Sequence, residues 1–183
     1  MTFISLQYAL FLLVLFAAYW LVPMRWWRLF IMLVASLIFY ASLQIWYIPL
    51  LLAGILFNYC LAMAIGEPLD WRIANEPWNR RRLWLLWIGI CLNVLLLLGF
   101  KYVPFLLSSI GTLLNWPFAL DGADWVKSHV IAPLGLSFFC FECIAYLIDV
   151  YRGAPAATSL LHFAAYKLFF PKLISGPITR YHN

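Results

Sequence analysis

The sequence predicts an all-α protein that crosses a membrane several times, with about five to seven membrane-embedded helices in one domain over residues 1–183. Apolar residues make up 66% of the chain, against roughly 45–50% in soluble domains. Charged residues make up 10%, against roughly 25%. A soluble domain of this size cannot bury so much apolar surface, because burial is limited by the ratio of surface to volume.

The first half of the chain contains two long stretches without charge. Residues 1–24 hold no charged residue and predict a first span near 3–22, retained because no small-residue cleavage site follows it. Residues 29–66 would form a helix of about 57 Å, nearly twice the hydrocarbon thickness. We therefore expect spans at 29–44 and 48–66, with a reversal where Trp46 and Tyr47 precede Pro49.

The second half begins with an aqueous loop over residues 67–82. Further spans are expected near 83–100, 133–151 and 160–174. A segment at 103–118 is weakened by Pro104 and Asn115, so a re-entrant or interfacial helix is the alternative there.

Basic residues mark the orientation and the surroundings of the chain. The short loop around Arg25 and Arg28 and the loop containing Arg72 and Arg80–Arg82 carry Lys or Arg, while the turn at 44–49 carries none. By the positive-inside rule, both basic loops face the cytoplasm and the N-terminus lies outside. Such short clusters are typical of contacts with the head groups of membrane lipids, and no groove-reading motif suggests nucleic acid.

The predicted helix at 133–151 carries ionisable residues within an apolar segment. Glu142, Tyr146 and Asp149 lie at i, i+4 and i+7 and share one helix face, and Arg152 follows at pairing distance from Asp149. Because charges are costly inside a bilayer, this face is expected to line a wet interior. The alternative is structural: Asp149 and Arg152 form a pair at the helix end, and hydroxyl groups cap Glu142.

Other polar side chains have structural explanations. Asn58 and Asn93 are single amides in apolar helices and are expected to hydrogen-bond between helices. Cys140 and Cys143 have redox-motif spacing, but their apolar surroundings favour packing over redox or zinc chemistry.

The three histidines do not complete a catalytic site. His129, His162 and His182 all lie outside the deep apolar helices, and no nucleophile-elbow motif accompanies them. The sequence therefore offers neither a catalytic set nor a metal site.

Two motif blocks resemble the membrane-bound O-acyltransferase family. The first runs from Pro133-Leu-Gly-Leu-Ser-Phe-Phe to Tyr-Leu-Ile-Asp-Val-Tyr-Arg-Gly153, and the second runs from Phe169-Phe-Pro-Lys-Leu-Ile-Ser to Gly176-Pro-Ile-Thr-Arg-Tyr181. Looser agreement covers Ser36–Tyr40 and the Asn58-Tyr59 pair. The likeness is greatest to the bacterial branch that includes alginate O-acetylation and teichoic-acid D-alanyl transfer proteins.

The resemblance implies the N-terminal half of a ring of helices around a tunnel in the bacterial inner membrane. An acyl donor, acetyl-CoA or an acyl-carrier thioester, would enter from the cytoplasm, and no cofactor would be bound. A polysaccharide hydroxyl would accept the acyl group from outside, with an acyl-carrier or periplasmic acetyltransferase as a further partner. Glu142, Tyr146 and Asp149 would line or brace the tunnel, while Arg152 and Arg180 would anchor loops or meet anions.

The family's catalytic His lies beyond the second block, so none of the three histidines matches it. The chain is therefore expected to be incomplete at its C-terminus, with no catalytic residue of its own. Without the remaining helices, the Glu142 face would point into lipid. Three hypotheses follow: part of an acyltransferase for an exported polysaccharide such as alginate, a transporter or channel subunit using Glu142 and Asp149, or an inactive remnant.

Overall fold

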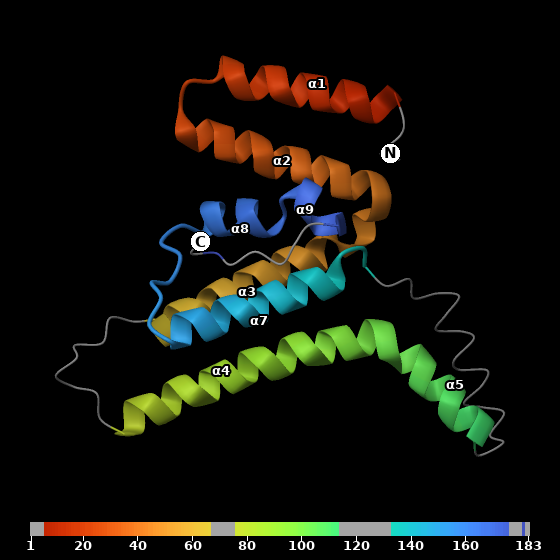
Figure 1. Ribbon diagram of the computed structural model, residues 1–183, viewed down its shortest axis with the longest axis vertical. Helices are drawn as coiled ribbons and strands as arrows, with labels where there is room; N and C mark the ends of the chain where they lie inside the picture. Colours follow the sequence, from red (N-terminus) through yellow and green to blue (C-terminus); the bar gives the residue numbers. More distant parts are fainter. Residues whose placement is uncertain (1–5, 67–75, 114–132, 176–180, 182–183) are drawn as a thin grey trace.

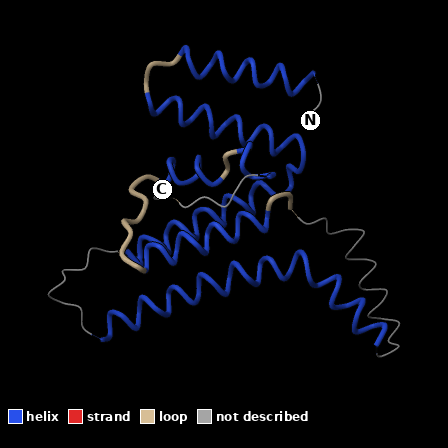
Figure 2. The backbone as a smooth tube through the Cα atoms, viewed as in Figure 1, coloured by secondary structure: helices blue, strands red, loops and turns tan. Residues whose placement is uncertain are grey.

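The computed structural model describes residues 6–66, 76–113, 133–175 and 181. Every regular element in these ranges is helical (Figure 1, Figure 2). Helices α1 (Leu6–Leu21) and α2 (Arg25–Gln44) lie at one end of an elongated stack, and α4 (Glu76–Leu97) lies toward the other end. Between them lie α3 (Ile48–Gly66), α7 (Leu136–Tyr151), α8 (Leu160–Lys167) and α9 (Phe170–Ser175). The all-α expectation is confirmed for the described part of the chain.

The long apolar stretch of the first half reverses direction at a short 3-10 turn, Ile45–Tyr47. It is thus divided into α2 with 20 residues and α3 with 19, which measure about 30 and 28 Å. After this turn α3 runs in the direction opposite to α2, with α8 packed between the two helices (Figure 1). The reversal lies within the turn that the sequence predicts between Gln44 and Pro49.

Two apolar stretches, Arg25–Gly66 with its internal turn and Arg80–Phe100, are long and apolar enough to cross a membrane. Their outer faces carry large exposed apolar side chains, among them Trp84 and Trp87 on α4. An aqueous surface rarely holds so many apolar side chains in contiguous patches. These features agree with a membrane protein, while the number of spans stays a prediction.

The packed centre is formed by α7 against α3 and α4. Gly89 of α4 allows close approach, because a Cβ atom there would lie 2.5 Å from Leu147 Cδ1 and 2.6 Å from Leu61 Cδ2. One face of α7 is buried, with eight residues: Leu136, Phe139, Cys140, Glu142, Cys143, Tyr146, Leu147 and Val150. Cys140 and Cys143 are packing residues and free thiols, as predicted.

Helix α3 is joined to α4 by an amide pair within this centre. Asn93 Nδ2 donates to Asn58 Oδ1 at 2.9 Å, and each amide also donates to a backbone carbonyl one turn earlier on its own helix. Both side chains are buried. The predicted hydrogen bond between helices is confirmed.

The start of α4 corrects one expectation. Residues 76–82, assigned to an aqueous loop over 67–82, are helical because α4 begins at Glu76. Arg82 Nε donates to the Ile65 carbonyl at 2.9 Å, and its Nη2 donates to the Tyr151 carbonyl at 2.9 Å. These carbonyls belong to the last turns of α3 and α7, where a cation satisfies groups that lack helical partners. Arg82 thus joins three helices.

The predicted helix at 160–174 is also corrected, because it is two short helices, α8 and α9. Pro171 has no N–H to donate to the Lys167 carbonyl, and its ring clashes with a carbonyl at that position of a continuous helix. The chain bends at Leu168 and Phe169, and Pro171 lies in the first turn of α9. At about 12 Å, α8 alone is too short to cross a bilayer core of about 30 Å.

The expected helix at 103–118 is described as α5 (Val103–Leu113), and residues 114–118 lie outside the described part. A π-helical turn, Leu98–Tyr102, separates α5 from α4. At this turn α5 bends away from the line of α4 (Figure 1). Such turns are a recognised cause of helix kinks.

Candidate functional site

The most polar buried feature of the described chain is a cluster of three charged side chains from three helices. Glu142 of α7 is 4% exposed, and Lys172 of α9 places its Nζ 2.7 Å from Glu142 Oε1. Lys167, the last residue of α8, is also 4% exposed and places its Nζ 3.9 Å from Oε2. The three formal charges sum to +1. We call this set the Glu142 cluster.

Aromatic rings enclose the two ammonium groups. Lys172 Nζ lies 3.6 Å from the ring centroid of Tyr166. Lys167 Nζ lies 5.4–5.7 Å from the centroids of Phe163, Tyr166 and Tyr146. Ring faces attract cations electrostatically and do so more strongly when water is excluded. The rings therefore offset part of the desolvation cost of the lysines.

The contact between Lys172 and Glu142 is an ion pair without hydrogen-bond geometry at Nζ, which is buried. Its strength therefore comes from charge attraction in a poorly hydrated site. Both oxygens of the Glu142 carboxylate are engaged by lysines, so the arrangement does not favour a general base. The geometry instead suits a bracing role, because it fixes α7 to the bend between α8 and α9.

The position of Glu142 overturns one expectation. The chain on its own was expected to turn the Glu142 face into lipid, but α8 and α9 cover this carboxylate and supply two cations. The residues that sequence reasoning missed are Lys167 and Lys172. A signal was available: both lysines lie within an apolar segment, where a charge requires a partner, and Glu142 is an acid in a neighbouring apolar segment.

Tyr146 lies on the same face of α7, next to the Glu142 cluster. Its hydroxyl oxygen accepts a hydrogen bond from the Ala157 N–H at 2.8 Å, in the segment between α7 and α8. Its ring lies 4.7 Å from that of Phe163 and 5.4 Å from that of Tyr181. Tyr181 belongs to the second motif block, so Tyr146 connects the two blocks directly.

The remaining candidate residues lie apart from this cluster. Asp149 is partly buried and Arg152 is exposed, and the structure shows no ion pair between these two described side chains. Arg180, His129 and His182 lie outside the described residues. His162 is exposed at the start of α8, with its ring 5.8 Å from that of Trp26.

One face of α2 holds the starts of α7 and α9. Tyr40 donates its hydroxyl to the Leu134 carbonyl at 3.3 Å, and Gln44 Oε1 accepts from the Leu134 N–H at 2.7 Å. Ser36 Oγ accepts from the Phe170 N–H at 3.3 Å. These three residues are spaced by four and therefore share a face. Tyr40 and Gln44 satisfy both backbone groups of Leu134, next to Gly135 with its left-handed φ of 74°, and Ser36 satisfies the N–H of Phe170.

Within the described ranges, no group of three or more His, Cys, Asp and Glu side chains could hold a metal ion. The described site thus contains braces and aromatic contacts rather than a nucleophile–base pair. The role that these contacts support is structural, because they position helices around a buried charge.

Comparison with known proteins gives consistent matches over nearly the whole chain. It is 36% identical over 175 residues to "Probable alginate O-acetylase AlgI" of Pseudomonas putida, covering 95% of this chain and 34% of that protein. The protein of the same name from Azotobacter vinelandii is 35% identical, with 95% and 33% covered. The "Peptidoglycan O-acetyltransferase" of Helicobacter pylori is 35% identical, with 93% and 33% covered.

The chain is therefore homologous to alginate O-acetylases and to a peptidoglycan O-acetyltransferase, and the resemblance to this bacterial branch is confirmed. It spans about a third of the length of these relatives, less than the half implied by the motif blocks. No family model matches the chain, and no solved structure does.

Proposed function

We propose that this chain is the N-terminal part of a membrane-bound O-acyltransferase that acetylates hydroxyl groups of an exported polysaccharide such as alginate. The observation that carries the proposal is the 36% identity to an alginate O-acetylase across 95% of the chain. The reaction forms an ester between the acceptor oxygen and the acyl carbon of a thioester donor, and releases the donor as a thiol. The donor is acetyl-CoA or an acyl-carrier thioester.

Within this proposal, α7 is a brace of the wall of the reaction chamber. Glu142 and Tyr146 hold α8, α9 and Tyr181 in place, and Asp149 continues the same helix face. Arg152 and Arg180 anchor loops or meet anionic groups at the chamber ends. The residue that activates the acceptor hydroxyl belongs to the remaining length of the whole protein.

The proposed location is the bacterial inner membrane, with the N-terminus outside and the turn between α1 and α2 in the cytoplasm. The basic residues Arg25 and Arg28 near that turn support this orientation. A tunnel through the membrane then brings a cytoplasmic donor to an external acceptor. An acyl-carrier or periplasmic acetyltransferase is the proposed protein partner.

The test is a gene deletion in the producing bacterium, complemented by the intact gene. The measured quantity is the number of O-acetyl esters per sugar in the exported polysaccharide and in peptidoglycan. We expect deletion to lower the esters of one of the two polymers and the intact gene to restore them. Unchanged esters in both polymers would contradict the proposal and leave the inactive-remnant hypothesis.

The complemented strain also tests the brace. Glu142→Gln, in the intact gene, should lower ester content at least in proportion to any loss of protein in the membrane, as measured by immunoblot. Unchanged acyl transfer at an unchanged protein level would show that Glu142 has no role in the reaction chamber. The transporter alternative gains no support from Glu142, because this carboxylate is paired with two lysines.

A further inference from the structure

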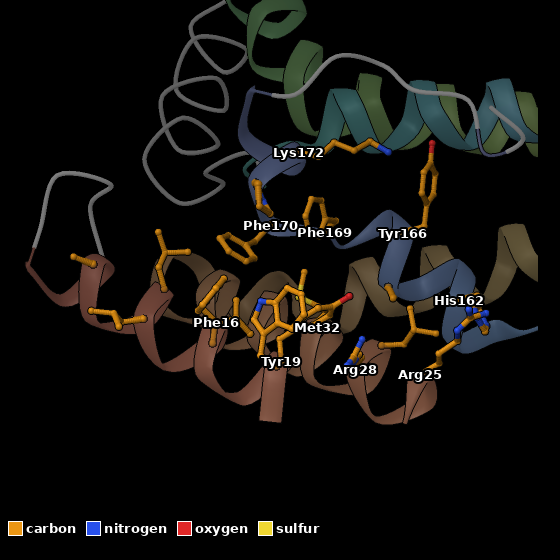
Figure 3. A pocket seen from close by; sticks show the side chains of 18 of the residues that line it. Phe16, Tyr19, Arg25, Arg28, Met32, His162, Tyr166, Phe169, Phe170 and Lys172 are labelled. Carbon is orange, nitrogen blue, oxygen red and sulfur yellow. The ribbon is translucent and has the colours of Figure 1, made fainter. Parts of the chain in front are cut away.

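A large apolar groove lies between the α1–α2 pair and the α8–α9 pair. Its volume is about 1620 Å³, well above the roughly 300–1,000 Å³ typical of pockets for small ligands. The walls are mostly apolar: Phe16 of α1, Met32 of α2, and Phe169 and Phe170 at the bend between α8 and α9 lie along it (Figure 3). A site of this size and lining suits a hydrocarbon chain rather than a compact polar metabolite.

The two ends of the groove differ in charge. Arg25, Arg28 and His162 lie together at one end, and the phenylalanine side chains lie toward the other (Figure 3). The distance from Arg25 to Met32 along α2 is about 10 Å. No acidic residue is among the described side chains that line the groove. The lining is therefore that of an amphiphile site, with two arginines at one end and the phenylalanine side chains toward the other.

The two arginines at this end have different tasks. Arg28 Nε donates to the Val22 carbonyl at 2.7 Å, and its guanidinium lies 5.1 Å from the Tyr19 ring centroid. Arg28 is thus fixed in place by the turn between α1 and α2. Arg25 is exposed, so its guanidinium is accessible to a head group. Lys172 also lines the groove, which places the excess positive charge of the Glu142 cluster beside it.

We propose that this groove binds a membrane phospholipid with an anionic head group. The phosphate lies against Arg25 and Arg28, and an acyl chain lies against Phe16 and Phe169. Basic pockets between membrane helices select anionic head groups, because the phosphate charge of a zwitterionic lipid is offset by its own ammonium group. The lipid site needs no part in acyl transfer.

The test uses the intact protein of which this chain is the N-terminal part, purified in mild detergent and analysed by native mass spectrometry. Phosphatidylglycerol and phosphatidylcholine with identical acyl chains are titrated separately. We expect one phosphatidylglycerol to bind at least about fivefold more tightly, and Arg25→Gln to reduce that preference about fivefold. The matched control is Arg80→Gln on α4, an exposed arginine outside the groove, which should keep the preference.

A second variant tests the apolar part of the groove. Ala9→Trp places a large ring in the groove from an exposed position of α1, and should weaken binding of both lipids equally. Equal affinity for the two lipids, or an Arg25→Gln variant that retains the preference, would overturn the proposal. A lipid-free dimer would also overturn it, because a second copy would then fill the groove. The readout is lipid retention, so it is independent of acyl transfer.

Discussion

Helices α1 and α7 have the same length, 16 residues, and opposite environments. Helix α1 contains no charged residue, and none of its residues is buried. Helix α7 contains Glu142 and Asp149, and eight of its residues are buried. The helix with more charge is therefore the one at the centre of the molecule.

This difference shows what orders helices in an apolar solvent. Lipid tails are as apolar as leucine, so hydropathy does not draw one helix inside another. Close packing, hydrogen bonds and paired charges are what hold one helix among the others. Helix α7 offers all three, through Gly89 of α4, the Tyr146 hydroxyl and the Glu142 cluster. Helix α1 offers one wall of an apolar groove.

The largest expected effect comes from removing the buried carboxylate. Glu142→Gln leaves two buried ammonium groups without their counter-charge, which costs about 3–5 kcal/mol for a buried pair. The measurement is the free energy of unfolding in mixed micelles with rising SDS, followed by circular dichroism. Asp149→Asn on the same helix is the control and should change stability by less than about 1 kcal/mol. Equal losses of stability for both variants would contradict a specific stabilising role of the Glu142 cluster.

A smaller effect is expected when one leucine is truncated to alanine in α7 and, for comparison, one in α1. Leu147→Ala creates a cavity at a residue that is 0% exposed and should cost about 2 kcal/mol or more. Leu10→Ala on α1 removes a side chain that is 55% exposed and should stay within about 0.5 kcal/mol of the parent. The same unfolding assay compares them. Similar losses at both positions would mean that α1 is packed inside the whole assembly.

The smallest of these effects tests the close approach of α4 to α7. Gly89→Ala forces Leu147 and Leu61 to move, and overpacking of this kind costs about 1–3 kcal/mol. Gly99→Ala is the matched control, because no atom lies within 4 Å of a Cβ atom there. The SDS midpoint should fall for the first variant only. A fall for Gly99→Ala alone would show that helix geometry, and not packing, sets the response.

Much of the fold follows from local sequence. The length of the charge-free stretch and the position of Pro49 predict the reversal after Gln44, because a single helix would be nearly twice as long as a bilayer core is thick. The Asn58–Asn93 hydrogen bond follows from the cost of a lone amide among apolar residues. The break before Pro171 was equally local, yet hydropathy concealed it because the residues on both sides are apolar.

The candidate site was less accessible to sequence reasoning. Glu142 was identified from its depth in an apolar helix, but its partners lie 25 and 30 residues further on, across a turn. Helical spacing relates residues within one helix and does not relate separate helices. The role of Arg82 was missed for the same reason, since its carbonyl partners lie on α3 and α7.

The central structural claim is that the ion pair between Glu142 and Lys172 holds the two motif blocks together. A double-mutant cycle with Glu142→Gln and Lys172→Met, scored by free energy of unfolding, measures this link most directly. The predicted coupling lies in the upper part of the roughly 0.5–3 kcal/mol range of contacting residues, with the double variant more stable than the sum of single losses implies. Additive losses, within about 0.3–0.5 kcal/mol, would contradict it.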